Sequence, residues 1–118
     1  MMNESDTITG LIQQIIDYNL LVIVEGKKDK SALEQLGVQR IMQLEAHHAL
    51  AEKIHDKEVV LLVDLDKEGK KIYGKLKDML SRRGVRVNDK LRHYLFKNTK
   101  LRQVEGLGGL GHYLGNAD

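Results

Sequence analysis

Three carboxylates follow apolar runs of the sequence at spacings that suit metal and phosphate chemistry. Asp64 and Asp66 come after the run at residues 59–63, and Glu25 follows the run at residues 20–24. Carboxylate oxygens are hard ligands of the kind that suits Mg²⁺. Without a cation, three such groups would repel one another and raise one another's pKa values. These residue types predict a Mg²⁺ site at Asp64 and Asp66, with Mn²⁺ as the alternative ion, and place Glu25 to move a proton.

The two apolar runs indicate strands that are buried on both faces. Residues 20–24 and 59–63 are uninterrupted and rich in β-branched side chains, as in a parallel sheet. Weaker candidates for strands are residues 40–44, 85–87 and 101–104. Open α/β sheets bind ligands at the carboxyl edge of their parallel strands. If the first two strands are neighbours, the three acids converge at that edge.

Helical patterns alternate with these strands and predict an α/β domain. The fold class expected is a Rossmann-like, three-layer domain with a mostly parallel sheet of four to five strands. The predicted helices follow Thr7, follow Asp29 or Ser31, cover residues 46–55 and 69–83, and follow Asn88 or Asp89. Their predicted ends are at Asn19, Gly37 and Gly84. Ser31 and Glu34 have the spacing of a capping box, and Arg92 is placed on the polar side of the last helix.

Basic residues gather in the second half of the chain. Residues 1–58 hold six basic and ten acidic side chains, whereas residues 59–118 hold thirteen basic and seven acidic ones. All thirteen lie between Lys67 and Arg102. A one-sided basic segment of this kind contacts phosphate backbones, and a solvated helix face is the alternative interpretation.

Composition limits the classes of protein and of site. The chain has 118 residues, enough for one domain with a single core. It has no cysteine, which excludes disulfides and thiolate metal sites and suits a reducing cytoplasm, so a cytoplasmic location is predicted. No apolar run is long enough for a membrane span, and the first residues lack the pattern of a secretory signal. Only five aromatic residues are present, so base stacking on an aromatic platform is not expected.

Two motifs resemble those of a known family. The sequence VEGKKD at residues 24–29, followed by DLDKEG at residues 64–69, is similar to the Toprim domain shared by topoisomerases, bacterial-type primases and several nucleases. The resemblance covers roughly residues 20–104 and implies a Rossmann-like parallel sheet with a Mg²⁺ site. It implies that the positions of Asp64 and Asp66 hold the metal. It also implies that the position of Glu25 acts as acid or base in making or breaking phosphodiester bonds.

Other residues in and near the motifs have predicted supporting roles. Gly26, Asp29 and Gly69 match motif positions and are expected to shape the two loops. The basic residues nearest the motifs are candidate phosphate contacts, with solvated surface lysines as the alternative: Lys27, Lys28, Lys67, Lys70 and Lys71. The alternative for each aspartate is a helix cap, because aspartates at strand-to-helix turns commonly accept the first free N–H groups.

The predicted organisation has three parts. Residues 1–19 form a packing helix, residues 20–104 the Toprim domain, and residues 105–118 a glycine-rich tail. The resemblance is greater to small stand-alone Toprim proteins, and to the bacterial nuclease that matures the smallest ribosomal RNA, than to topoisomerases or primases. Val104 and Glu105 faintly resemble a late acidic motif of that nuclease.

The predicted function is that of a Mg²⁺-dependent enzyme acting on phosphodiester bonds of DNA or RNA, most simply a nuclease. Its predicted partner is nucleic acid, and no association with a membrane is expected. One alternative is a non-catalytic nucleic-acid-binding module that works with a protein partner. The other is a receiver-like phosphoacceptor domain, which the single acid before Gly26 and Lys27 disfavours because receivers carry an acidic pair after the first strand.

Overall fold

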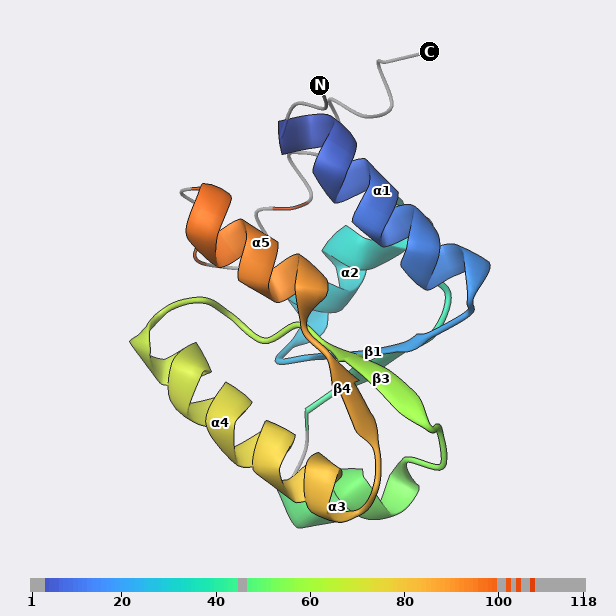
Figure 1. The fold of residues 1–118 in the computed structure, drawn as a ribbon, viewed down its shortest axis with the longest axis vertical. Helices are drawn as coiled ribbons and strands as arrows, with labels where there is room; N and C mark the ends of the chain where they lie inside the picture. Colours follow the sequence, from blue (N-terminus) through green and yellow to red (C-terminus); the bar gives the residue numbers. More distant parts are fainter. Residues whose placement is uncertain (1–3, 45–46, 100–101, 103, 105–106, 108–118) are drawn as a thin grey trace.

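The computed structural model describes residues 4–44 and 47–99, together with residues 102, 104 and 107. Helices and strands alternate along this part of the chain (Figure 1), which confirms the α/β class. Their order is α1 (Glu4–Asp17), β1 (Leu21–Val24), α2 (Lys27–Gln35), β2 (Ile41–Gln43), α3 (His47–Lys53), β3 (Glu58–Leu61), α4 (Lys67–Arg82), β4 (Arg86–Asn88) and α5 (Lys90–Asn98). Within the described ranges, none of these helices is long and apolar enough to cross a bilayer.

The sheet has the order β2-β1-β3-β4, and every neighbouring pair is parallel. The predicted parallel sheet is therefore confirmed, with four strands in the described residues. β1 and β3 lie side by side in the middle, with Leu21 opposite Val59. From β1 the chain continues outward to β2, and from β3 it continues outward in the other direction to β4. The topological switch point, where ligands bind in folds of this kind, thus lies between β1 and β3.

Apart from Glu58 at the start of β3, the two central strands are apolar at every position because both of their faces are covered. Val22 and Val24 of β1 belong to a core cluster formed with α1, α2 and α5. Leu21 and Ile23, which point to the opposite face, belong to a second cluster formed with α3 and α4. Figure 1 shows the same layers, with α1, α2 and α5 on one face of the sheet and α3 and α4 on the other. Successive side chains of a strand point to opposite faces of the sheet, and because both faces are buried here, the sequence shows uninterrupted apolar runs.

The predicted helix ends coincide with residues in the left-handed backbone region. Asn19 has a φ of 51°, Gly37 of 96° and Gly84 of 81°. These conformations stop a helix, and glycine and asparagine adopt them at least cost. The predicted start of α2 is wrong, because the helix begins at Lys27 and places Ser31 inside it, so Ser31 and Glu34 form no capping box.

The chain beyond α5 returns to the sheet. Val104 and Leu107 are 1% and 0% exposed and belong to the cluster shared with α1, α2 and α5. Leu107 therefore packs in the core although it lies in the predicted tail at residues 105–118; Glu105 is outside the described residues. Arg102 and Val104 are not in a strand, contrary to the strand expected at residues 101–104, where positions 101 and 103 are also outside the described part.

Candidate acidic site at the carboxyl edge of the sheet

The ends of β1 and β3 bring two of the predicted site residues into direct contact. Glu25 follows β1, and Asp64 lies three residues beyond the end of β3. The Glu25 Oε1 atom accepts a hydrogen bond from the Asp64 backbone N–H at 2.9 Å. Because β1 and β3 are neighbours, the two motifs meet at the switch point across 39 residues of sequence.

Negative charge gathers around the half-buried Glu25. Burial is the main cause that raises the pKa of Glu25 from its ordinary value of 4.5, and the hydrogen bond from Asp64 lowers it by less. The charges of Asp64, Asp29 and Asp66 add to the increase, in that order. The charges of these nearby acids therefore make the charged form of Glu25 more costly.

Asp64 is held by residues that follow α5 in the sequence. Its Oδ1 atom accepts a hydrogen bond from the Val104 backbone N–H at 2.7 Å. The next residue, Leu65, donates its own N–H to the Arg102 carbonyl oxygen at 2.6 Å. The segment after α5 thus fixes both the carboxylate and the backbone of the acidic loop.

Asp66 caps α4, so the alternative interpretation of this aspartate holds as well. It is the N-cap residue, and its Oδ1 atom accepts a hydrogen bond from the Gly69 N–H at 2.8 Å. The positive end of the helix dipole also stabilises a carboxylate in this position. Because a carboxylate has two oxygens and about four lone-pair positions, capping leaves it able to bind a cation.

Gly69 is required by close packing between the start of α4 and the acidic loop. A Cβ atom built on Gly69 would lie 2.0 Å from the Asp64 carbonyl oxygen. Any side chain at this position would therefore push the helix away from the residue that carries the acid.

The first loop is shaped by Asp29 more than by Gly26. The Asp29 Oδ2 atom accepts a hydrogen bond from the Gly26 N–H at 3.0 Å, and Asp29 is buried. Gly26 is extended, with a φ of −147°, which any residue adopts, and a Cβ there would make only an ordinary contact. The conformation of Gly26 therefore does not require glycine, and its expected role in shaping the loop stays a prediction.

The candidate phosphate contacts are exposed and lie at the starts of two helices. Lys27 and Lys28 begin α2, and Lys67, Lys70 and Lys71 lie in the first turns of α4. Both helices start at the carboxyl edge of the sheet, where their N-terminal N–H groups favour anions. The five lysines therefore lie on the two helices that start at the edge of the sheet where the acids are, and their contact with phosphate stays a prediction.

Arg92 is a functional candidate that the sequence analysis placed wrongly. It is 8% exposed rather than on the polar side of α5. Its guanidinium donates hydrogen bonds to the carbonyl oxygens of Val63, at 3.3 Å, and Asp64, at 3.1 Å. The same group lies 4.2 Å from the centre of the Tyr73 ring, whose hydroxyl donates to Asp89. Arg92 thus fixes the backbone of the acidic loop through hydrogen bonds from the buried side of the loop.

The burial of Arg92 has an electrostatic consequence. Burial lowers the pKa of Arg92, while the charges of Tyr73, Asp89, Glu25 and Asp64 raise it by less. A buried cation near the acids offsets part of their mutual repulsion. The spacing along α5 could have indicated this burial, because Arg92 lies three residues before the buried Leu95 and so on the same side of the helix. A charged side chain at that position, however, gave no reason to expect it in the core.

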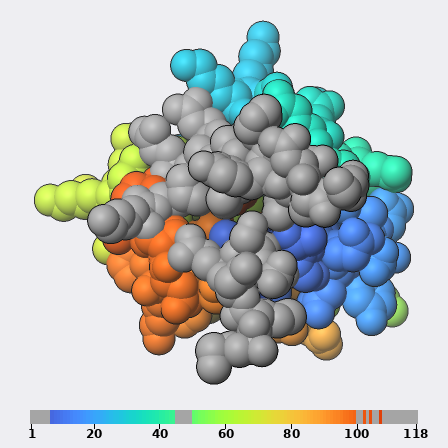
Figure 2. Space-filling model, turned by 90° about the horizontal axis from the view of Figure 1, so that it is seen from above, coloured from blue at the N-terminus to red at the C-terminus, as the bar shows by residue number. Residues whose placement is uncertain are grey.

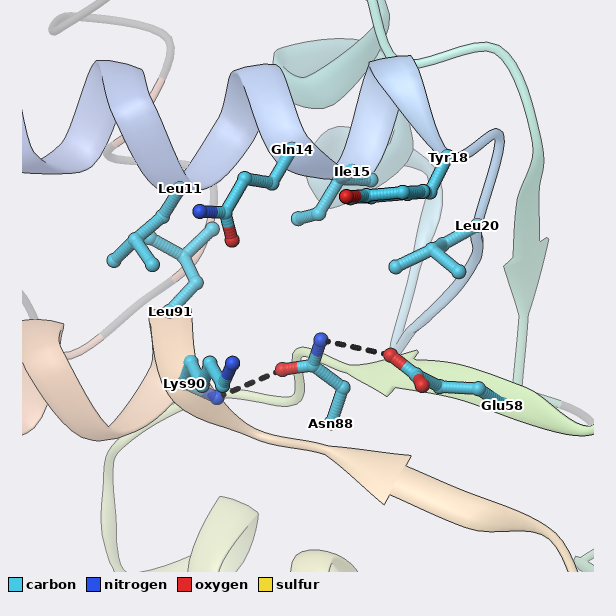
Figure 3. A pocket seen from close by; sticks show the side chains of 9 residues that line it. All are labelled: Leu11, Gln14, Ile15, Tyr18, Leu20, Glu58, Asn88, Lys90 and Leu91. Carbon is cyan, nitrogen blue, oxygen red and sulfur yellow. Dashed lines mark hydrogen bonds between the residues drawn. The ribbon is translucent and has the colours of Figure 1, made fainter.

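A separate cavity lies away from the acids. Its volume is about 340 Å³, and Figure 3 shows side chains of α1, β3, β4 and α5 around it. Glu58 and Asn88 face each other in its wall, with Asn88 Nδ2 donating to Glu58 Oε2 at 3.1 Å. Glu58 begins β3, whereas Asp64 follows the other end of that strand. None of the predicted site residues lines this cavity.

Comparison with protein families agrees with the motifs and the geometry. The Toprim domain profile matches residues 19–89, more than half of the chain, so the protein belongs to the Toprim domain family. Toprim domains are metal-dependent modules related to nucleic acids and generally bind Mg²⁺. The match gives no support to a receiver-like phosphoacceptor domain.

Individual relatives extend the similarity over most of the chain. The chain is 34% identical to a UPF0292 protein of Methanocaldococcus jannaschii over 94 residues, which cover 73% of each chain. It is 31% identical to a UPF0292 protein of Thermococcus sibiricus over 106 residues, 85% of this chain and 84% of the relative. A solved structure of a protein from Aquifex aeolicus is similar with a TM-score of 0.74 and 27% identity, over 82% of this chain and 94% of the other.

Proposed function

We propose that this protein is a Mg²⁺-dependent nuclease, an enzyme that breaks phosphodiester bonds of DNA or RNA. The observation that carries the proposal is the contact between Glu25 and Asp64 at the switch point of a Toprim domain. It joins a proton-handling carboxylate to the acidic loop at the edge where folds of this kind bind ligands.

The donor set fits Mg²⁺, and Mn²⁺ as its alternative. In the described residues, no three Asp, Glu or His side chains are gathered as a cage around a metal. Mg²⁺ does not need such a cage, because it usually binds through one or two carboxylates, several waters and substrate phosphate oxygens. Asp64 and Asp66 would supply the protein's share of these ligands. When bound, the metal would stabilise negative charge on the phosphate and activate a water.

Glu25 is the residue that we propose to move a proton. Its raised pKa allows it to hold a proton to a higher pH than an ordinary glutamate. The hydrogen bond from the Asp64 N–H fixes the position of its Oε1 atom. Asp29 holds the loop after Glu25 through Gly26, and Arg92 holds the loop at Asp64. These contacts support the proposal, because they hold the loops that carry Glu25 and Asp64 in fixed relative positions, as oriented catalysis requires.

One observation favours a second function, that of a non-catalytic module which binds nucleic acid together with a protein partner. Asp66 caps α4, and Asp64 accepts the Val104 N–H, so both acids already have structural uses. In such a module the five lysines nearest the motifs would hold a nucleic-acid backbone without cleavage. Binding would then persist, with its salt dependence, after the acids are neutralised.

A cleavage assay separates these two functions. Structured RNA, single-stranded DNA and duplex DNA are incubated with the protein, with Mg²⁺ and with chelator. The variant is Asp66→Asn, because asparagine caps a helix as well as aspartate does and only the charge is lost. The matched control is Asp78→Asn, an exposed acid on the same helix that pairs with Arg82.

We expect cutting only with Mg²⁺, and a decrease of about 100-fold or more in Asp66→Asn, since several kcal/mol of charge stabilisation are lost with the metal. Asp78→Asn should cut as the unaltered protein does. Cutting that continues in chelator, or equal rates in the two variants, would contradict the proposed site. Binding without cutting of any substrate would favour the second function.

A further inference from the structure

An exposed aromatic ring lies beside the acidic site with two cations over it. Phe96 is the only phenylalanine of the chain and is 37% exposed. The Lys70 Nζ atom lies 4.4 Å from the centre of its ring, and the Arg102 Cζ atom 5.2 Å. Cations are attracted to the negative face of an aromatic ring. The result is a flat apolar surface flanked by positive charge, which suits the base and the phosphates of a nucleotide.

Both cations are attached to the loop that carries the acids. Lys70 lies one helical turn after Asp66, and its backbone N–H donates to the Asp66 carbonyl oxygen at 3.0 Å. The Arg102 carbonyl oxygen accepts the hydrogen bond from Leu65 at 2.6 Å. The backbones of Lys70 and Arg102 are therefore fixed to the loop that carries the proposed metal ligands.

The ring itself is attached to the same loop through α5. Phe96 follows Arg92 by four residues, about one helical turn, and the Arg92 guanidinium donates to the Asp64 carbonyl oxygen. Figure 2 shows the neighbourhood from above, with α5 in orange beside the lime segment that begins α4. Three separate contacts thus place Lys70, Phe96 and Arg102 at the border of the acidic site.

Although the small number of aromatic residues gave no reason to expect base stacking, we infer that Phe96 stacks on an unpaired base, so that the strand which enters the acidic site is single-stranded at this point. A paired base has neighbours on both faces, whereas an unpaired base can stack on a protein ring and can have any sequence. Lys70 and Arg102 contact the phosphates on either side of that base. This inference rests on the proposed function and adds the class of strand, which the carboxylates do not determine.

The two cations differ in how they accommodate the base. The Arg102 guanidinium also donates to the Thr99 carbonyl oxygen at 3.1 Å, which ties it to the end of α5. Lys70 is exposed and has a long flexible side chain. In this inference Lys70 is the cation that leaves the ring for a phosphate when the base stacks, because its side chain is exposed, whereas Arg102 is held at the end of α5.

The chain provides a direct optical test of stacking. It has no tryptophan, so Phe96→Trp introduces a single fluorescent reporter at the ring. Tyr18→Trp is the matched control, because Tyr18 is the other exposed large apolar side chain in the described residues, at 75%, and lies beside the separate cavity. Each variant is titrated with a short oligothymidylate and with a duplex of the same length, with chelator present. We expect quenching of Phe96→Trp by the single strand only, and no quenching of Tyr18→Trp.

An affinity measurement complements the optical one. Phe96→Leu keeps an apolar side chain and removes the ring, and we expect the affinity for the single strand to fall by about 5- to 100-fold. Tyr18→Leu should bind as the unaltered protein does, and circular dichroism of each variant checks that the fold is kept. The absence of quenching in Phe96→Trp, or an equal loss of single-strand and duplex affinity in Phe96→Leu, overturns the inference.

The result is independent of cleavage because no Mg²⁺ is present in these titrations. If the single strand quenches Phe96→Trp but no substrate is cut with Mg²⁺, the proposed function fails and the inference stands. If Mg²⁺-dependent cutting occurs on duplexes and single strands alike and is unchanged in Phe96→Leu, the function stands and the inference fails.

Discussion

Gly69→Ala should destabilise the protein, because there is no room for a methyl group where α4 meets the acidic loop. The new Cβ would lie 2.0 Å from the Asp64 carbonyl oxygen and 2.5 Å from the carbonyl carbon, whereas real Cβ atoms essentially never come within 3.0 Å of such neighbours. Helix and loop must therefore separate by about 1 Å, and overpacking of this kind costs about 1–3 kcal/mol. The higher helix propensity of alanine returns about 1 kcal/mol. Since backbone rather than a flexible side chain has to move, we expect a cost at the upper end of this range, about 3 kcal/mol, and hence a net loss of about 2 kcal/mol.

Gly74→Ala is the matched control in the same helix. A Cβ at Gly74 meets no atom within 4 Å, and the residue is exposed. Without a clash only the change in propensity remains, so this variant should gain about 0.5–1 kcal/mol. Urea denaturation followed by circular dichroism gives the free energy of unfolding of both variants. The same chemical change in one helix should thus have opposite signs at the two positions.

The outcome that would refute this reasoning is a Gly69→Ala variant as stable as the unaltered protein. It would mean that the start of α4 can move away from the loop at no cost, so the close approach would have no role in positioning Asp64. A loss of stability in both variants would show that the helix tolerates no alanine for some other reason, and would also refute the steric argument.

Two further predictions concern charges near the acids. Arg92→Met removes hydrogen bonds to the carbonyl oxygens of Val63 and Asp64 and should lower the free energy of unfolding by about 2–3 kcal/mol. The control Lys97→Met, at an exposed position of the same helix, should change it by less than about 0.5 kcal/mol. Equal effects of the two variants in urea denaturation would contradict this structural role of Arg92. Glu25 has a raised pKa in the folded state, so its contribution to stability is full below the unfolded value of about 4.5 and is lost as the pH rises through the folded pKa. Glu25→Gln, which keeps an acceptor for Asp64, should therefore exceed the unaltered protein in stability at neutral pH and lose this advantage in acid; an advantage that does not change with pH in denaturation series would contradict the raised pKa.

The parts of the fold that could be predicted are those that depend on local patterns. The apolar runs at residues 20–24 and 59–63 gave two central strands, because burial of both faces leaves no polar position. Asn19 and Gly84 marked helix ends, because few other residues adopt a positive φ easily. The convergence of Glu25 and Asp64 depended only on β1 and β3 being neighbours.

What could not be predicted depends on contacts between distant parts of the chain. Arg92 looked like one of many surface cations, and only its position behind Asp64 makes it a buried donor. The hydrogen bond from Val104 to Asp64 joins residues 40 apart in sequence. Phe96 showed no pattern of its own, and its surroundings appear only when α5, Lys70 and Arg102 are placed together.

The contacts of Arg102 and Val104 with the acidic loop have a consequence for folding during protein synthesis. Glu25, Asp64 and Asp66 leave the ribosome well before Val104. A nascent chain that ends within α5 therefore has its acids but lacks the amide that Asp64 accepts and the carbonyl that fixes Leu65. Domains form from the N-terminal side as they are made. The arrangement of the acids is thus completed only after the residues that follow α5 have been made, later than the sheet that supports it.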